Sequence, residues 1–141
     1  MYVPAGLNNV VALASGEDHI LALRADGTVT VWGSCLFPWG VEPPTVPTGL
    51  SNVVAISAGN NQSMALRADG TVVAWNSQGL QSIPVGATNV VSIAAGGYGV
   101  VVHNAVVRAD GRAVAWGAGA VPAGLSNAVM AAAGETHVLA L

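Results

Sequence analysis

Residues 52–75 read NVVAISAGNNQSMALRADGTVVAW, and this stretch decides the fold. Its two apolar runs, 52–56 and 62–66, are short and bounded by Gly or Asn, which is typical of buried strands. The Asp-Gly pair at 69–70 is a strong hairpin signal, because both residues tolerate the positive φ angles of a two-residue turn. Residues 71–75 supply a third strand. The stretch therefore predicts a three-stranded antiparallel meander, and no window has helical periodicity.

The same phrases recur along the chain at roughly 40-residue intervals, within the range of propeller and solenoid repeats. Each unit opens with Val-Pro or Ile-Pro, which gives a single domain over residues 1–141 with units at 3–45, 46–82 and 83–120 and a partial unit at 121–141. A small meander cannot bury two apolar faces alone, so it must stack on its neighbours, and radial stacking gives a propeller. We therefore expect an all-β fold, a β-propeller of short three-stranded antiparallel blades forming a partial ring of about three and a half repeats, with the Ala-rich first strands innermost.

Composition excludes several classes of function. Hydrophobic residues make up 52% of the chain and charged residues only 8%, against about 25% charged in an average domain. A net charge of −3 with only four Lys and Arg argues against a nucleic-acid partner. Cys35 is the only cysteine, which excludes an internal disulfide and a multi-Cys zinc site. We expect no metal and no cofactor.

The chain shows no signal for export or membrane insertion. Residues 1–6 have neither the basic nor the apolar region of a signal peptide. No apolar run approaches the roughly 20 residues of a membrane helix. We therefore expect no signal peptide in this chain and no membrane contact, and the compartment stays open.

The recurring phrases Val-Pro-x-Gly-Leu-x-Asn-Val-Val-Ala-Ile and Ala-Leu-Arg-Ala-Asp-Gly-Thr-Val-x-Ala-Trp-Gly resemble the regulator-of-chromosome-condensation (RCC1-like) repeat in its short bacterial form. The unit is also similar to that of the type II β-lactamase inhibitor proteins, which are secreted seven-bladed propellers. The resemblance covers nearly the whole chain and implies a ring whose loops bind a partner protein. In the inhibitors, the loop between the first and second strands faces the partner. The matching positions here are Glu17, Asp18, Asn60, Asn61, Gly97, Tyr98, Glu135 and Thr136.

Two segments depart from the repeat pattern. The loop at 35–39 carries Leu36, Phe37 and Trp39 in a chain that is only 5% aromatic. Exposed aromatics are frequent in binding hot spots, so this loop is either a partner contact or a plug folded over its blade. The extra segment at 99–105 lengthens the second strand of the third unit, and we expect His103 within it to be exposed.

The remaining candidate residues favour architecture over chemistry. His19 and His137 recur after Gly-x-x, where the other units have Gln62 and Gly99, so we interpret them as framework residues hydrogen-bonded to nearby backbone. The Arg and Asp of the Arg-Ala-Asp-Gly turns are expected to be solvated. No nucleophile elbow or phosphate-binding loop is present, so no catalytic residue is assigned. We expect blade-to-blade packing of the recurrent tryptophans Trp32, Trp75 and Trp116.

The sequence thus predicts a non-catalytic protein-interaction module. A part-ring exposes apolar blade faces and sheet edges, so we expect it to close by self-association, with a head-to-tail dimer favoured. The alternative is a structural or engineered propeller fragment without a dedicated partner. A binder of the β-lactamase-inhibitor kind is less favoured, because Tyr98 is the only aromatic residue at the matched loop positions. An enzyme ranks last.

Overall fold

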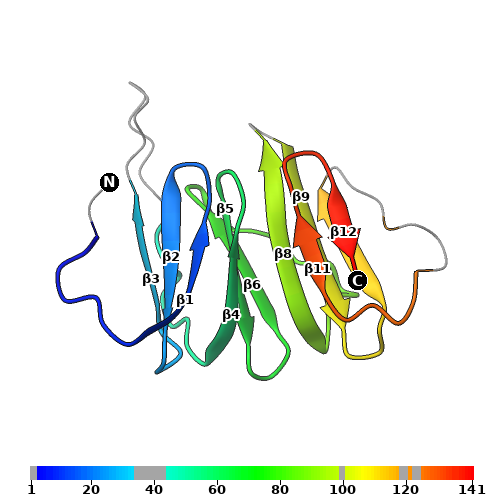
Figure 1. Ribbon diagram of the computed structural model, residues 1–141, viewed down its shortest axis with the longest axis horizontal. Coiled ribbons are helices and arrows are strands. Elements are labelled where there is room, and N and C mark those ends of the chain that lie inside the picture. The colour runs from blue at the N-terminus through cyan, green and yellow to red at the C-terminus, as the bar shows by residue number, and fades with distance from the viewer. Residues whose placement is uncertain (1–2, 34–43, 99–100, 118–120, 122–124) are drawn as a thin grey trace.

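The described part of the chain is built from β-strands. The computed structural model describes residues 3–33, 44–98, 101–117, 121 and 125–141 (Figure 1). In chain order the strands are β1 (Val10–Ser15), β2 (His19–Arg24), β3 (Val29–Gly33), β4 (Val53–Ala58), β5 (Gln62–Arg67), β6 (Val72–Asn76), β7 (Gly79–Leu80), β8 (Val90–Tyr98), β9 (Val101–Arg108), β10 (Ala113–Gly117), β11 (Ala131–Ala133) and β12 (Val138–Ala140). None of the described residues lies in a helix, and so none forms a helix able to cross a bilayer. The expected all-β class is confirmed.

The antiparallel sheets follow the chain as β1-β2-β3, β4-β5-β6-β7, β8-β9-β10 and β11-β12. Three-stranded meanders were predicted, and the second sheet differs because it gains the short strand β7. Asn76 accounts for the extra strand. Its Oδ1 accepts hydrogen bonds from the backbone N–H of Gln78 at 2.8 Å and from Nε2 of Gln81 at 3.0 Å. This side-chain-capped turn folds the chain back onto β6, where Trp75 pairs with Leu80 and Asn76 with Gly79.

The Asp-Gly hairpins mark real turns, but the predicted two-residue geometry is wrong. In the first sheet, Gly27 N–H donates to the Arg24 carbonyl at 3.0 Å, and the loop spans residues 25–27. Only Gly27 has a positive φ, 76°, as in a type I turn that ends in a left-handed glycine. Asp26 acts instead as an acceptor. Its Oδ1 receives the N–H of Thr28 at 3.0 Å and the Oγ1 hydroxyl at 2.6 Å.

An Asn in the left-handed conformation precedes the first strand of every unit. The φ angles are 52°, 55°, 51° and 61° at Asn9, Asn52, Asn89 and Asn127. Asn adopts this region more readily than other non-glycine residues. The turn lets the carbonyl of Asn9 accept the N–H of Ala25 at 2.8 Å, so the recurrent Asn joins the first strand to the hairpin of the same sheet.

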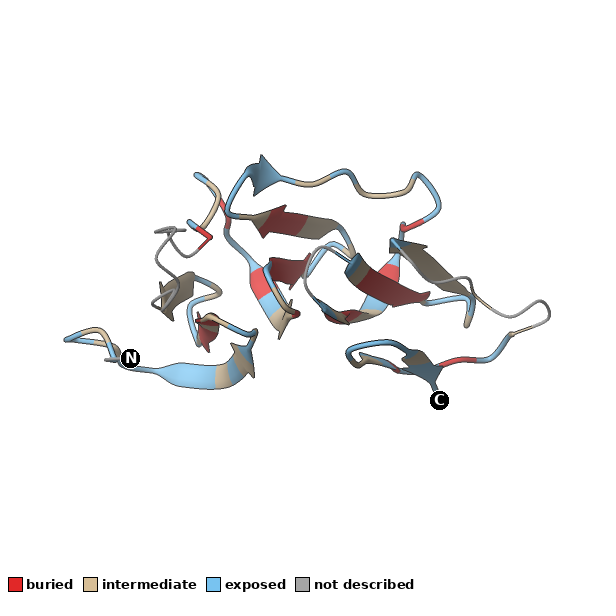
Figure 2. Cartoon of the chain, turned by 90° about the horizontal axis from the view of Figure 1, so that it is seen from above, coloured by how far each residue is buried: buried red, intermediate tan, exposed pale blue. Residues whose placement is uncertain are grey.

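The four sheets stand side by side in an arc, with both termini on its open side (Figure 2). The first strands β1, β4, β8 and β11 contact one another in succession along the inner side. A separate hydrophobic cluster fills each of the three gaps between neighbouring sheets. The core therefore lies between the blades, as expected for a propeller.

Two of the three third-strand tryptophans pack between blades, as predicted. Trp75 is buried in the cluster that contains Leu21 and Leu23 of the first sheet. Trp116 packs on the cluster built around Met64 of the second sheet. Trp32, the equivalent residue of the first sheet, is half-buried. Each third-strand Trp after the first thus packs against the preceding blade.

Candidate functional site

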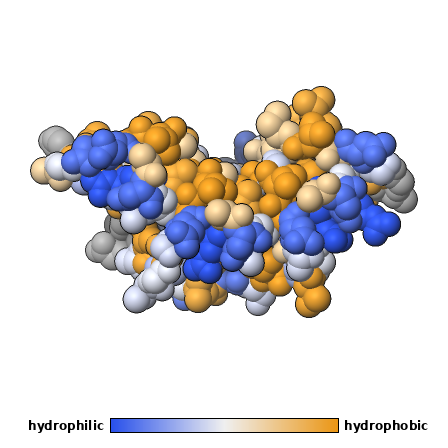
Figure 3. All heavy atoms as spheres, turned by 90° about the horizontal axis from the view of Figure 1, so that it is seen from below, coloured by the Kyte–Doolittle hydropathy of each residue, from blue (hydrophilic) through white to orange (hydrophobic). Residues whose placement is uncertain are grey.

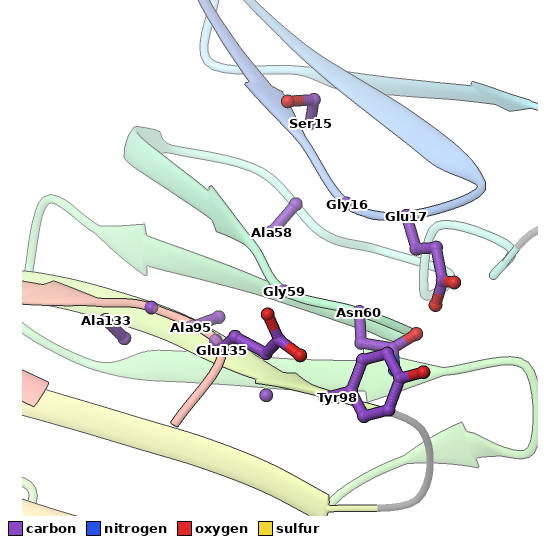
Figure 4. A pocket seen from close by; sticks show the side chains of 13 residues that line it. Ser15, Gly16, Glu17, Ala58, Gly59, Asn60, Ala95, Tyr98, Ala133 and Glu135 are labelled. Atoms are coloured by element: carbon purple, nitrogen blue, oxygen red, sulfur yellow. The ribbon is translucent and has the colours of Figure 1, made fainter. Parts of the chain in front are cut away.

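The loops between the first and second strands meet at one end of the arc and surround an open depression of about 350 Å³ (Figure 4). Each of the four sheets contributes to it. Glu17, Asn60, Tyr98 and Glu135 line it, one from each sheet. The structure thus brings together one residue from each of the four loop positions predicted from the sequence.

The depression has a floor of glycine because neighbouring backbones approach closely there. A Cβ atom added to Gly16 would collide with the carbonyl of Gly59, one on Gly59 with Gly96, and one on Gly96 with Gly134. The approach is reinforced by a backbone hydrogen bond from Gly97 N–H to the Gly134 carbonyl, at 3.1 Å. Any side chain on this row would push the blades apart, so these glycines fix the shape of the floor.

The rim is dominated by the hairpin of the third sheet. Strands β8 and β9 have nine and eight residues, against six in each of the corresponding strands of the first two sheets. The extra segment was predicted to lengthen the second strand, and the structure shows that both strands are longer. Tyr98 ends β8 with 64% of its surface exposed. A tyrosine this exposed presents an apolar ring and a hydrogen-bonding hydroxyl to a partner.

This end of the molecule carries unbalanced negative charge. Glu17, Asp18 and Glu135 lie on its loops. The chain's four cations are all arginines, and they flank the Asp-Gly turns at the other end: Arg24, Arg67, Arg108 and Arg112. The field at the depression therefore favours positively charged groups.

At the Asp-Gly end the turn aspartates Asp26, Asp69 and Asp110 are exposed to solvent, as expected, and one of them forms an ion pair with an arginine. Arg108 Nη2 lies 3.4 Å from Asp110 Oδ2, and Arg24 Nη2 donates to the Asn8 side chain at 2.8 Å. The hydrogen bonds from Thr28 hold the pKa of Asp26 below its ordinary value. Seen from this end, hydrophilic groups alternate with hydrophobic ones along the arc (Figure 3).

The other predicted contacts lie outside the depression or outside the described residues. Asp18 and Thr136 occupy the same loops as the lining residues. Asn61 points toward its own sheet, where its Nδ2 donates to Ser77 Oγ at 3.3 Å. The loop residues Leu36, Phe37 and Trp39 fall in the segment 34–43, which is not among the described residues.

Two buried polar pairs join the blades beneath the site. His19 Nε2 lies 2.9 Å from Ser63 Oγ of the second sheet, and Asn104 Nδ2 of the third sheet donates to Gln62 Oε1 at 3.1 Å. The framework interpretation of His19 is confirmed, although its partner is a side chain and not backbone. Burial lowers the pKa of His19, against a smaller opposing effect of Asp18.

His103 was expected to be exposed, and this is wrong. It is buried, and it pairs with Gly117 exactly as His19 pairs with Gly33 and Gln62 with Asn76. The repeat position after Gly-x-x therefore belongs to His103 and not to Gly99. The sequence spacing misled because the longer hairpin inserts residues between Gly96 and His103, which remain paired.

The pair of His19 and Ser63 cannot act as a nucleophile and base, because both side chains are almost fully buried and no substrate can reach the hydroxyl. Among the described residues, no group of three or more His, Cys, Asp or Glu side chains could hold a metal ion. The arrangement at the loop end is instead that of a surface able to contact a macromolecule.

Comparison with known proteins agrees with this architecture. The family model of the regulator of chromosome condensation (RCC1) repeat matches residues 10–34, and no curated protein matches. Yeast RCC1 (Prp20), in its crystal structure with Kap60, is 22% identical with a TM-score of 0.68, over 99% of this chain and 43% of that one.

Two further solved structures share the fold. Human WBSCR16 is 21% identical with a TM-score of 0.69, over 97% of this chain and 45% of that one. The ectodomain of the Physcomitrella patens receptor kinase CR4 is 25% identical with a TM-score of 0.68, over 93% and 37%. The chain spans less than half the length of these proteins. Residues 10–34 thus match the model of the RCC1 repeat, and the chain shares the blade architecture of these solved β-propellers.

Proposed function

We propose that this chain is a non-catalytic protein-interaction module that binds its partner at the loop end of the arc. One observation carries the proposal. The lengthened β8–β9 hairpin places the exposed ring of Tyr98 at the rim where the loops of four blades converge. Binding sites are commonly formed by loops on a rigid scaffold, and tyrosine is enriched among the residues that dominate binding energy.

The similar structures support a protein partner. Yeast RCC1 was crystallised bound to Kap60, and Prp20p of Saccharomyces cerevisiae has binding properties to Gsp1p and histones. The charges and the aromatic ring at the loop end indicate what kind of partner surface this chain would bind. Glu17, Asp18 and Glu135 favour a contact surface that carries Lys or Arg around an apolar patch for Tyr98. Leu36, Phe37 and Trp39 form a second predicted contact.

The experiment compares binding by matched variants. Immobilised wild-type chain, Tyr98→Ala and Glu17→Gln/Glu135→Gln are exposed to a lysate of the source organism, and the retained proteins are quantified. Arg112→Gln, an exposed charge at the opposite end, is the control. We expect a protein retained by wild type and control, lost with Tyr98→Ala, and held less tightly by the double variant, with the difference shrinking at high salt. Equal retention by all four would refute binding at the loop end.

We also propose that the units at 3–45, 46–82, 83–120 and 121–141 act as one domain whose ring is completed by self-association. The supporting observation is the exposure of large apolar side chains on the two terminal sheets, among them Leu13 and Leu139. Two copies related by a rotation would close as a dimer. Light scattering on a sizing column tests this, because a clean monomer at all concentrations would contradict it.

A further inference from the structure

In each of the first three sheets one face is covered by the following sheet, whereas the residues on the same face of the fourth sheet are exposed among the described residues. The register makes Leu21, Met64, Ala105 and Leu139 equivalent, because each pairs with the same position of its first strand. In the first three sheets this residue is at most 2% exposed, but Leu139 is 61% exposed. Two residues further on, Leu23, Leu66 and Val107 are buried while Leu141 is 75% exposed.

The covering residues are also the same from blade to blade. Ile56 and Trp75 of the second sheet pack against the cluster of Leu21 and Leu23. Ile93 and Trp116 of the third sheet pack in the same way on the cluster of the second. The second and third blades thus each offer an aliphatic residue of the first strand and the Trp of the third strand to the blade before them.

The first sheet carries the same covering pair, and no other described sheet packs on that face. The residue equivalent to Ile56 is Leu13, which is 65% exposed, and the residue equivalent to Trp75 is Trp32, which is half-buried. The arc therefore ends in two complementary faces. We call the face with Leu139 and Leu141 the trailing face, and the face with Leu13 and Trp32 the leading face.

We propose that the trailing face is a docking site for the leading face of a second copy of this chain, packed as β4 and β6 pack on β2 within one copy. The inference rests on the proposed self-association and assigns its interface. The interface is head-to-tail, so each copy contributes different residues. The first and fourth sheets lie at the two ends of the arc, toward its open side (Figure 2). Hydrophobic residues gather at both ends (Figure 3). A second copy placed on the open side can therefore contact both terminal sheets.

The test uses one charge-introducing variant on each face. Leu139→Glu alters the trailing face and Leu13→Glu the leading face, and Val85→Glu, at a 95% exposed position on neither face, is the control. Circular dichroism and thermal melting of each variant verify that it folds. By light scattering and analytical ultracentrifugation, we expect each face variant to weaken self-association at least about tenfold, whereas the control does not.

Mixing the two face variants decides the orientation. A head-to-tail interface leaves the leading face of Leu139→Glu and the trailing face of Leu13→Glu intact, so the mixture should form a one-to-one complex although neither variant associates alone. If wild type associates but Leu13→Glu has no effect, copies meet through identical trailing faces or through sheet edges, and this inference fails while self-association stands. If wild type is a monomer at all concentrations, both proposals fail.

Discussion

Substitution of equivalent leucines should separate covered blade faces from open ones. Leu21 is fully buried between the first two sheets, whereas Leu139 occupies the same repeat position and is mostly exposed. Truncating a buried leucine to alanine removes transferred apolar surface and leaves a cavity, at a cost of about 2–5 kcal/mol. Leu21→Ala should therefore lose about 3 kcal/mol of the roughly 5–15 kcal/mol that stabilises a domain. For dissociated chains, Leu139→Ala should change stability by less than about 0.5 kcal/mol.

Urea unfolding monitored by tryptophan fluorescence measures the stability of both variants. The protein concentration is kept low enough for the chain to be monomeric. The midpoint for Leu21→Ala should fall sharply while that for Leu139→Ala stays near wild type. Raising the protein concentration should stabilise wild type but benefit Leu139→Ala less, because association stabilises by mass action. Equal losses for the two variants at low concentration would refute the assignment of covered and open faces.

Three further predictions concern residues that shape the blades and their contacts. Burial depresses the pKa of His19 in the folded chain below its value in the unfolded chain. The contribution of His19 to stability is therefore complete above pH 6.5 and is lost as the pH falls. His19→Gln keeps a hydrogen bond to Ser63 but should flatten the pH dependence of the urea midpoint between pH 7 and 5. Asn52→Ala should cost about 1 kcal/mol because of the left-handed backbone, and Asn52→Gly should cost less, as measured by thermal melting. Gly59→Ala should destabilise the chain by about 1–3 kcal/mol, since the new methyl meets the backbone of Gly96, and unchanged stability would contradict the close approach.

The repeat pattern made the strands and their stacking predictable, because the same physical requirement recurs in each unit. Apolar runs at a fixed distance from an Asp-Gly pair indicate a meander, and a meander with two apolar faces needs neighbours. The clustering of the loops that carry Glu17, Asn60, Tyr98 and Glu135 was predictable for the same reason: equivalent loops of stacked repeats lie at the same end of the array.

The sequence was less informative where side chains act across blades. Nothing in the sequence around Ser63 indicates that its hydroxyl forms a hydrogen bond with His19, which lies 44 residues earlier in the chain. The sequence does not reveal why Gly16, Gly59 and Gly96 must be glycine, because the steric reason lies in the backbone of the neighbouring sheet. The strand β7 depends on hydrogen bonds to one side chain, that of Asn76, which differs from the glycine of the other units.

The loop end and the terminal faces use different parts of the same blades, so the two proposals do not compete for surface. Tyr98 projects from a hairpin tip, whereas Leu139 and Leu141 lie on the side of a sheet. Closing the ring by head-to-tail contact would leave the loop end accessible. It would also bring the loops of a second copy, with their own equivalents of Glu17 and Glu135, around the same axis. The shallow depression would then become one side of a larger depression lined by acidic loops of both copies. An assembled ring should therefore bind a basic partner surface more tightly than a single arc does.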